Sequence, residues 1–247
     1  MKNVLAANWK MNKGPDETTA FFKQFISLLS EAQQDNLVFF VPAVDWVATS
    51  VSIKNTALKW GSQNCYFEDS GAFTGENSPE ILKTLGGQYC LVGHSERRQI
   101  FKETDEDVNK KTLSLLKKHM TPMICVGETL GERNANRTTE VVIGQLQKAL
   151  VEVSESVVVA YEPVWAIGTG QVATPEMAND VHCEIRSYLI SHFGQKIGQE
   201  IPILYGGSVK PNNAAELILQ SEINGFLVGG ASLDASVFAE LAKITFG

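Results

Sequence analysis

The sequence has no excess of positive charge and no long apolar run. Its 21 Lys and Arg residues stand against 28 Asp and Glu residues, which gives a net charge of −7, the wrong sign for attraction to nucleic acid or an anionic membrane surface. The longest segment without a charged residue, 163–175, has 13 residues, whereas a membrane-spanning helix needs roughly 18 apolar ones. We therefore expect neither a nucleic-acid partner nor a membrane partner.

The cysteines are widely and irregularly spaced, without a C-x-x-C pair or a histidine at zinc-ligand spacing. They are Cys65, Cys90, Cys125 and Cys183. This pattern indicates reduced thiols and predicts no metal site. The N-terminus has only a short apolar core followed by Trp9 and Lys10, which is not typical of a secretory signal, so a cytoplasmic location is expected.

Eight short apolar runs alternate with longer segments that have helical periodicity. Most of the runs show no polar alternation, as expected for strands buried on both faces of a parallel sheet. The runs are 4–8, 37–41, 58–62, 89–93, 123–127, 157–162, 203–206 and 226–229.

The intervening segments have apolar residues on one helical face. The spacing i, i+4, i+7, i+11 occurs at Phe21, Phe25, Leu28 and Ala32, and again at Val108, Thr112, Leu115 and His119. It predicts amphipathic helices through both sets. Thr174-Pro175-Glu176 predicts the start of another helix, because it supplies an N-cap, a first-turn proline and an acidic residue.

These elements predict an α/β protein with a closed eight-stranded parallel (β/α)8 barrel. Eight strands in about 250 residues match the size of this fold, and no Pro- or Ser-rich linker marks a boundary, so we expect a single domain over 1–247. An open doubly wound sheet is the alternative. Its Gly-rich fingerprint is missing after the first strand, where 7–10 reads Ala-Asn-Trp-Lys.

Polar residues stand where the first, fourth and sixth strands end, the rim at which a barrel carries its chemistry. Lys10 could be a solvated rim charge, and His94 could be a structural hydrogen-bonding residue. Glu162 closes a run of apolar residues, where a carboxylate would be partly desolvated. Because an unpaired buried charge is costly, Glu162 is the strongest candidate for a functional residue.

Two further features favour a ligand at this rim. The apolar segment 163–170 is either a lid that closes over a ligand or a loop packed permanently on the barrel. Glycine pairs at 206–207 and 229–230 end the last two strands. Such pairs let successive backbone N–H groups surround an anion, and a phosphate site after strands seven and eight is recurrent in this fold.

Taken together, these residues resemble the triosephosphate isomerase family, whose barrel is the TIM barrel. The resemblance runs in the family's order from residue 7 to residue 233. It is carried by segments 7–12, 71–76, 92–98, 160–170, 205–209 and 227–233. The resemblance implies interconversion of dihydroxyacetone phosphate and D-glyceraldehyde 3-phosphate through an enediolate, in glycolysis and gluconeogenesis, without metal or organic cofactor.

The resemblance also implies residue roles. Glu162 is the base, His94 the electrophile and Lys10 an electrostatic partner of the substrate; Asn8 is a polar contact. Ser95 and Glu96 support the site, Glu96 as a carboxylate beside Lys10. The phosphate cradle comprises Gly168, Ser208, Gly229 and Gly230. The lid comprises Pro163, Val164, Trp165, Ala166, Ile167, Gly168, Thr169 and Gly170. The loop that enters a second subunit of a homodimer comprises Phe73, Thr74, Gly75 and Glu76. Phe73 could equally pack on its own barrel.

Proton transfer next to a carbonyl sets requirements on the two main candidates. Lid closure should raise the pKa of Glu162 by desolvation, since a free carboxylate is a weak base. His94 should be neutral, because the helix start at Ser95-Glu96, burial and Lys10 all disfavour its charged form. A glutamate base, a neutral histidine and a closing loop are the well-known pattern of this same enzyme family, so these requirements restate that pattern.

Two other functions are alternatives. A phosphate-binding barrel without catalysis would lack the base or the electrophile, and a metal-dependent aldolase on the same fold would need clustered histidines at strand ends. His119, His182 and His192 are expected within helices instead. The sequence departs mildly from the family at Asn224, where an acidic residue is more familiar, and at Gly131.

Overall fold

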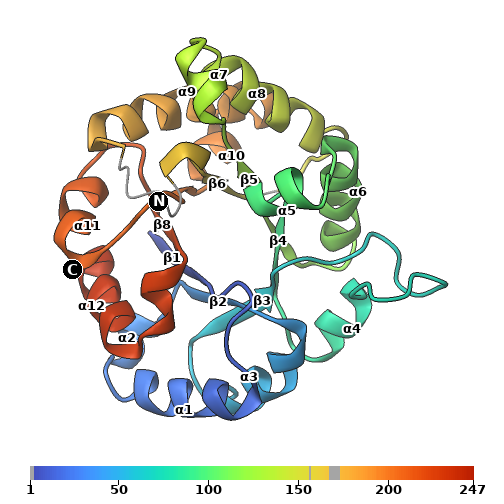
Figure 1. Ribbon diagram of the computed structural model, residues 1–247, viewed down its shortest axis with the longest axis vertical. Helices are drawn as coiled ribbons and strands as arrows, with labels where there is room; N and C mark the ends of the chain where they lie inside the picture. The colour runs from blue at the N-terminus through green and yellow to red at the C-terminus, as the bar shows by residue number, and fades with distance from the viewer. Residues whose placement is uncertain (1–2, 156, 167–172) are drawn as a thin grey trace.

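The computed structural model describes residues 3–155, 157–166 and 173–247 (Figure 1). Its parallel strands close into a barrel in the chain order β1 to β8, which confirms the predicted fold. The strands are β1 Val4–Asn8, β2 Leu37–Val41, β3 Lys59–Ser62, β4 Tyr89–Val92, β5 Thr121–Val126, β6 Val158–Tyr161, β7 Ile203–Tyr205 and β8 Gly225–Val228. The barrel closes where Leu5 of β1 pairs with Leu37 of β2 on one side and Phe226 of β8 on the other.

Both faces of the strands are buried, as the unbroken apolar runs predict. Val4, Ala6, Val38 and Phe40 belong to the cluster inside the barrel. Their strand neighbours, such as Phe39, pack outward against the helices. Because successive strand residues point to opposite faces, each run needs apolar residues at every position.

The helices form a ring around the strands (Figure 1). They are α1 Pro15–Ile26, α2 Glu31–Gln34, α3 Trp46–Ser52, α4 Pro79–Thr84, α5 Ser95–Ile100, α6 Asp105–Leu116, α7 Leu130–Asn134, α8 Thr138–Ala149, α9 Pro175–Phe193, α10 Gln195–Glu200, α11 Pro211–Ile218 and α12 Ala235–Phe246. Short 3₁₀ helices in the described loops are η1 Ala43–Asp45, η2 Val164–Ala166 and η3 Gly230–Leu233. Thr174 caps α9 through a bond from the N–H of Met177 at 3.2 Å, which confirms the predicted start. Within the part of the chain that is described, no helix is both long and apolar enough to cross a membrane.

Two predicted helices end earlier than their apolar spacing indicates. α1 stops at Ile26, and Ser30 begins a separate short helix with Gln33 as its capping partner, so Leu28 and Ala32 lie outside α1. α6 stops at Leu116, and His119 adopts a left-handed φ of 56° while the N–H of Met120 bonds to Leu115 O at 3.1 Å. This is a Schellman-type helix end, so the expectation that His119 is helical is wrong.

The strand ends differ from prediction by one or two residues, mostly at the rim. β6 ends at Tyr161 and leaves Glu162 just beyond it, and β4 ends at Val92 before Gly93. Gly93 has a φ of 71°, a left-handed conformation that ends the strand. The loop 63–78 between β3 and α4 projects from the side of the ring (Figure 1).

Candidate active site

The strand ends bring the predicted polar residues together at one rim of the barrel. A cavity of about 240 Å³ opens there. It is lined by Asn8, Lys10, His94 and Glu162, by 206–210 after β7 and by 227–231 at the end of β8. Since all strands are parallel, residues far apart in sequence meet where the carboxyl ends converge.

Lys10 is held in an unusual backbone conformation. Its φ is 52°, and its N–H donates to Asn8 Oδ1 at 3.0 Å. Its carbonyl accepts a bond from Gln63 Nε2 at 2.9 Å. The ammonium then reaches Glu96 Oε1 at 2.5 Å. These contacts fix Lys10 at the cavity wall, and they give Asn8 and Glu96 supporting positions on either side of it.

His94 and Glu162 are in direct contact at the wall of the cavity. His94 Nε2 lies 2.9 Å from Glu162 Oε1, and both side chains are almost fully buried. The other carboxylate oxygen, Oε2, accepts a bond from the N–H of Ser95 at 3.0 Å. On the far side of the ring, His94 Nδ1 accepts from the N–H of Glu96 at 3.2 Å. Since α5 begins at Ser95, the predicted helix start is confirmed.

The pKa of each partner follows from this pairing. For Glu162, burial raises the pKa, but His94, the N–H of Ser95 and Lys10 outweigh burial and hold it below its ordinary value. For His94, burial lowers the pKa, and the Glu162 carboxylate outweighs it and raises the pKa above the ordinary value. The expected lowering for His94 is therefore wrong for this arrangement, because the effect of the carboxylate exceeds that of burial and Lys10.

The hydrogen bonds nevertheless fit a neutral His94 ring. A proton on Nδ1 would face the N–H of Glu96, which leaves Nδ1 as an acceptor and Nε2 as the donor to Glu162. The raised pKa favours the charged form while this contact opposes it. The contact decides the state of the ring, because Nδ1 must accept from the N–H of Glu96 and so cannot carry a proton. The expected rise in the pKa of Glu162 on lid closure stays a prediction.

Glycines and Ser208 form the opposite side of the cavity. Gly206 passes so close to the base that a Cβ on it would lie 2.9 Å from Glu162 Cγ. Ser208, Gly229 and Gly230 line the cavity as predicted. The turn at Gly229 is closed by the N–H and the hydroxyl of Ser232, which donate to Gly229 O at 2.8 and 2.7 Å. This wall has the exposed backbone that phosphate binding needs. Gly168, the remaining predicted cradle residue, lies outside the described residues.

The beginning of the predicted lid is anchored to a buried carboxylate. Glu128 accepts bonds from Tyr161 Oη at 3.1 Å and Trp165 Nε1 at 2.9 Å, and pairs with Arg133 at 3.3 Å. The Arg133 guanidinium also lies 4.6 Å from the centre of the Trp165 ring. Glu128 thus joins the end of β6 to η2. Of the predicted lid, 163–166 has this anchored structure and 167–170 lies outside the described residues.

The loop predicted to enter a second subunit lies apart from the cavity walls described so far. Phe73 packs on Tyr66 with ring centroids 4.4 Å apart, and 39% of it is exposed. Thr74 is exposed, and Gly75 and Glu76 line a neighbouring cavity of about 300 Å³ that also reaches Lys10. Phe73 therefore has a partner in its own loop and an exposed face.

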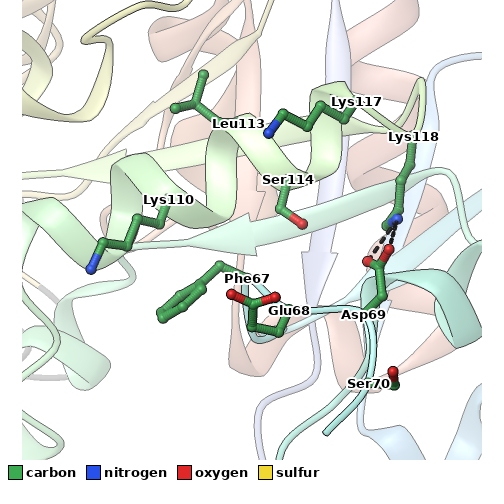
Figure 2. Close-up of a pocket in the computed structure, with 9 residues that line it drawn as sticks. All are labelled: Phe67, Glu68, Asp69, Ser70, Lys110, Leu113, Ser114, Lys117 and Lys118. Atoms are coloured by element: carbon green, nitrogen blue, oxygen red, sulfur yellow. Dashed lines mark hydrogen bonds and ion pairs between the residues drawn. The ribbon is translucent and has the colours of Figure 1, made fainter.

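A larger cavity, of about 630 Å³, lies elsewhere, between α6 and the loop after β3 (Figure 2). Its charged groups include an ion pair between Lys118 and Asp69 at 2.7 Å. The Lys110 ammonium lies 5.1 Å from the Phe67 ring centre. The smaller cavity is the stronger candidate for the site, because a buried carboxylate–imidazole pair faces the glycine backbone there.

The two departures from the family pattern have local consequences. Asn224 Oδ1 accepts bonds from Arg186 Nη2 at 2.9 Å and from the N–H of Ile203 at 3.0 Å. Glu222 supplies the carboxylate for Arg186, at 2.9 Å, so the neutral amide at 224 leaves the arginine paired. Gly131 lies in α7, and a Cβ there would meet no atom within 4 Å.

Several residues in or beside the site were not predicted from the sequence. Glu128 follows the apolar run of β5 just as Glu162 follows that of β6, so the signal that singles out Glu162 also indicates Glu128. Lys210 lines the cavity, yet it precedes a helix start at Pro211 and has no distinguishing pattern. Gln145 contacts the loop beneath Glu162 from an amphipathic helix, where no sequence signal marks it.

Comparisons with known proteins agree with this geometry. The family model described as triosephosphate isomerase matches residues 3–245. Triosephosphate isomerases from Bdellovibrio bacteriovorus and Pediococcus pentosaceus are 51% and 47% identical; the alignments cover 99% and 97% of this chain and 100% and 97% of theirs. A crystal structure of triosephosphate isomerase from Bartonella henselae superposes with a TM-score of 0.90 at 35% identity, over 99% of both chains. The chain therefore belongs to the triosephosphate isomerase family.

Proposed function

We propose that this chain interconverts dihydroxyacetone phosphate and D-glyceraldehyde 3-phosphate, with Glu162 as the base and His94 as the electrophile. The observation that carries these roles is the contact of 2.9 Å between His94 Nε2 and Glu162 Oε1 in the rim cavity. A proton next to a carbonyl can be removed only if a base reaches the carbon while a donor stabilises the oxygen that becomes negative. These two side chains provide both groups within one cavity.

The substrate has to separate this pair before reaction. Once a substrate oxygen accepts the hydrogen bond from His94 Nε2–H, Glu162 loses the partner that most strongly lowers its pKa. The pKa of Glu162 then rises, because burial is opposed only by the N–H of Ser95 and the charge of Lys10, and a higher pKa makes the carboxylate a stronger base. Glu162 takes a proton from C1 and returns it at C2, while His94 Nε2 gives its proton to the oxygen on C2 and takes one from the hydroxyl on C1, so that the carbonyl moves from C2 to C1.

Lys10 and the glycine wall would hold the remainder of the substrate. The Lys10 ammonium carries a positive charge at the cavity wall, although Glu96 lies 2.5 Å away. The backbone at Ser208, Gly229 and Gly230 supplies N–H groups for the phosphate. Charges are screened over about 8 Å at physiological ionic strength, so these local donors can bind an anion although the protein has a net charge of −7.

The base assignment is tested with Glu162→Gln. We expect kcat to fall by about a hundredfold to ten-thousandfold, the usual contribution of a general base, in a coupled assay on glyceraldehyde 3-phosphate. Competitive inhibition by inorganic phosphate should change little, since the cradle is unchanged. Glu240→Gln, an exposed carboxylate on α12, is the matched control. Near wild-type turnover of Glu162→Gln would exclude Glu162 as the base.

A homodimer is the proposed assembly. Large apolar side chains are exposed on the loops that follow β1 to β4: Met11 at 97%, Val44 at 64%, Phe73 at 39% and Phe101 at 66%. Phe101 and 75–77 line one common cavity with Lys10, so these loops adjoin. Exposed apolar side chains on adjoining loops favour an association site.

The dimer is tested by sedimentation of wild-type protein, Phe73→Asp and the control Leu219→Asp. Leu219 is 83% exposed at the end of α11, so a charge there should leave the mass unchanged. We expect Phe73→Asp to shift the mass toward one chain. An unchanged mass for Phe73→Asp, or a wild-type monomer at micromolar concentration, would contradict the dimer through this loop.

The remaining proposals concern the biological setting. We propose a cytoplasmic location, in keeping with the glycolytic and gluconeogenic role of the family, and a single domain over 1–247. Cell fractionation followed by the isomerase assay measures the location. A single unfolding transition, seen alike by fluorescence and circular dichroism, is expected for one domain.

A further inference from the structure

The side-chain amide of Gln145 holds both polar groups of one glycine beneath the site. Gln145 lies on α8 and is half-buried. Its Oε1 accepts from the N–H of Gly127 at 2.8 Å, and its Nε2 donates to Gly127 O at 3.2 Å. Only a side-chain amide offers a donor and an acceptor in this geometry at neutral pH, so Gln145 fixes the position and tilt of the Gly127 backbone.

Gly127 in turn lies directly against the backbone of Glu162. A Cβ on Gly127 would lie 1.8 Å from Glu162 O, so the two backbone segments are in direct contact with no side chain between them. The neighbours of Gly127 carry the next segment as well. Val126 O accepts from the N–H of Glu162 at 2.7 Å, and Glu128 O accepts from the N–H of Val164 at 3.1 Å. The loop 126–128 is therefore the support on which 162–164 is built.

We propose that Gln145 is a positioning residue for Glu162, acting through the backbone of Gly127. It touches no substrate, and the inference rests on the proposed function because it assumes that Glu162 is the base. A displacement of about 1 Å can lower a rate a hundredfold when a base must approach one carbon. If Gly127 were free to move, Glu162 could be displaced by this amount. The N–H of Glu162 donates to the carbonyl of Val126, the residue that precedes Gly127.

We expect the protein to fold without this amide. A cavity of about 160 Å³ adjoins Gln145, Gly127 and Glu162. Water entering this space can bond to the Gly127 N–H and C=O when the amide is removed, so no buried polar group is left unsatisfied. Water would satisfy both groups but would not hold Gly127 in one position, whereas the amide of Gln145 does.

The test compares Gln145→Met with Gln147→Met. Methionine keeps the length of glutamine and removes both hydrogen bonds, and Gln147 is an exposed residue two positions along α8. We expect Gln145→Met to lower kcat by about tenfold to a hundredfold. KM and the inhibition constant of inorganic phosphate should stay within about twofold, because the phosphate cradle belongs to β7 and β8. Gln147→Met should behave as wild type in every measurement.

An isotope effect separates positioning from partial unfolding. With dihydroxyacetone phosphate deuterated at C1, Gln145→Met should show a larger primary isotope effect on kcat than wild type, because proton transfer has become slower than the other steps. A smaller fraction of active enzyme would lower kcat and leave the isotope effect unchanged, which would overturn the inference.

A second variant covers the case in which Gln145→Met does not fold. Gln145→Glu keeps the acceptor for the Gly127 N–H and places a carboxylate oxygen against Gly127 O, so it should show the same loss in kcat with an unchanged phosphate inhibition constant. Wild-type kcat in either folded variant overturns the positioning role while the isomerase function stands. Failure of the unchanged chain to isomerise the substrate would instead overturn the proposed function, and the inference with it.

Discussion

The buried histidine of α9 should make the stability of this protein depend on pH. His182 has no exposed surface, and its ring lies 5.8 Å from that of Tyr161. Its Nδ1 lies 3.0 Å from Glu222 O, and within the described part of the chain its Nε2 has no partner. Burial, aided by the charge of Arg186, lowers the pKa of His182 from 6.5 to about 4. The folded protein therefore holds this ring neutral where an unfolded chain would protonate it.

The sign and size follow from proton linkage. A pKa that is lower in the folded state contributes stability that is complete above 6.5 and is lost as the pH falls toward 4. At 1.36 kcal/mol for each pKa unit, the full loss is about 3 kcal/mol, of which about 2 kcal/mol falls between pH 7 and pH 5. A loss of this size is a large part of the net stability of an ordinary domain.

The assay is urea unfolding at pH 7 and pH 5, at one protein concentration. His182→Gln keeps a donor for Glu222 O and cannot be protonated, so it should lose about 2 kcal/mol less than wild type between the two pH values. His119→Gln, at an exposed position, is the control and should follow wild type. Equal losses for wild type and His182→Gln would refute the reasoning, since they would show that His182 does not carry the shift.

Two other substitutions test the packing around the site. Gly206→Ala places a Cβ 2.9 Å from Glu162 Cγ, so the Glu162 side chain must move. We expect kcat to fall about tenfold, with inhibition by inorganic phosphate nearly unchanged. An unchanged kcat would contradict the close approach of Gly206 to Glu162. Asn224→Asp gives Arg186 a charged acceptor in place of the amide at 2.9 Å, and the free energy of unfolding from urea titration should rise by about 1 kcal/mol. A fall would mean that desolvation of the new carboxylate outweighs the gain.

The strand pattern and the rim residues could be predicted because they depend on local rules. A strand buried on both faces needs apolar residues at most positions, so eight short, mostly apolar runs separated by helical segments leave few alternatives to a barrel. β1 and β2 coincide with their predicted ranges. Because parallel strands bring their carboxyl ends to one rim, Lys10, His94 and Glu162 could be expected near one another before any distance was known.

Helix ends were harder to predict, because an apolar spacing continues past the point where the backbone turns. His119 keeps the spacing of α6 and yet terminates the helix in a left-handed conformation. The contact of Gln145 with Gly127, beneath Glu162, could not be predicted either, since the sequence does not show which backbone groups a polar residue on an amphipathic helix will bind.

The amino-acid sequence by itself determined the barrel, the rim that carries the polar residues and the family resemblance. Only the tertiary structure decided which partners these residues have and in which direction the pKa values of His94 and Glu162 move. His94 lies 2.9 Å from Glu162 and Lys10 lies 2.5 Å from Glu96, so each of these side chains has a partner from a distant part of the sequence. The physical reason is that a pKa is a balance of burial against neighbouring charges, and neither is known until the chain has closed on itself.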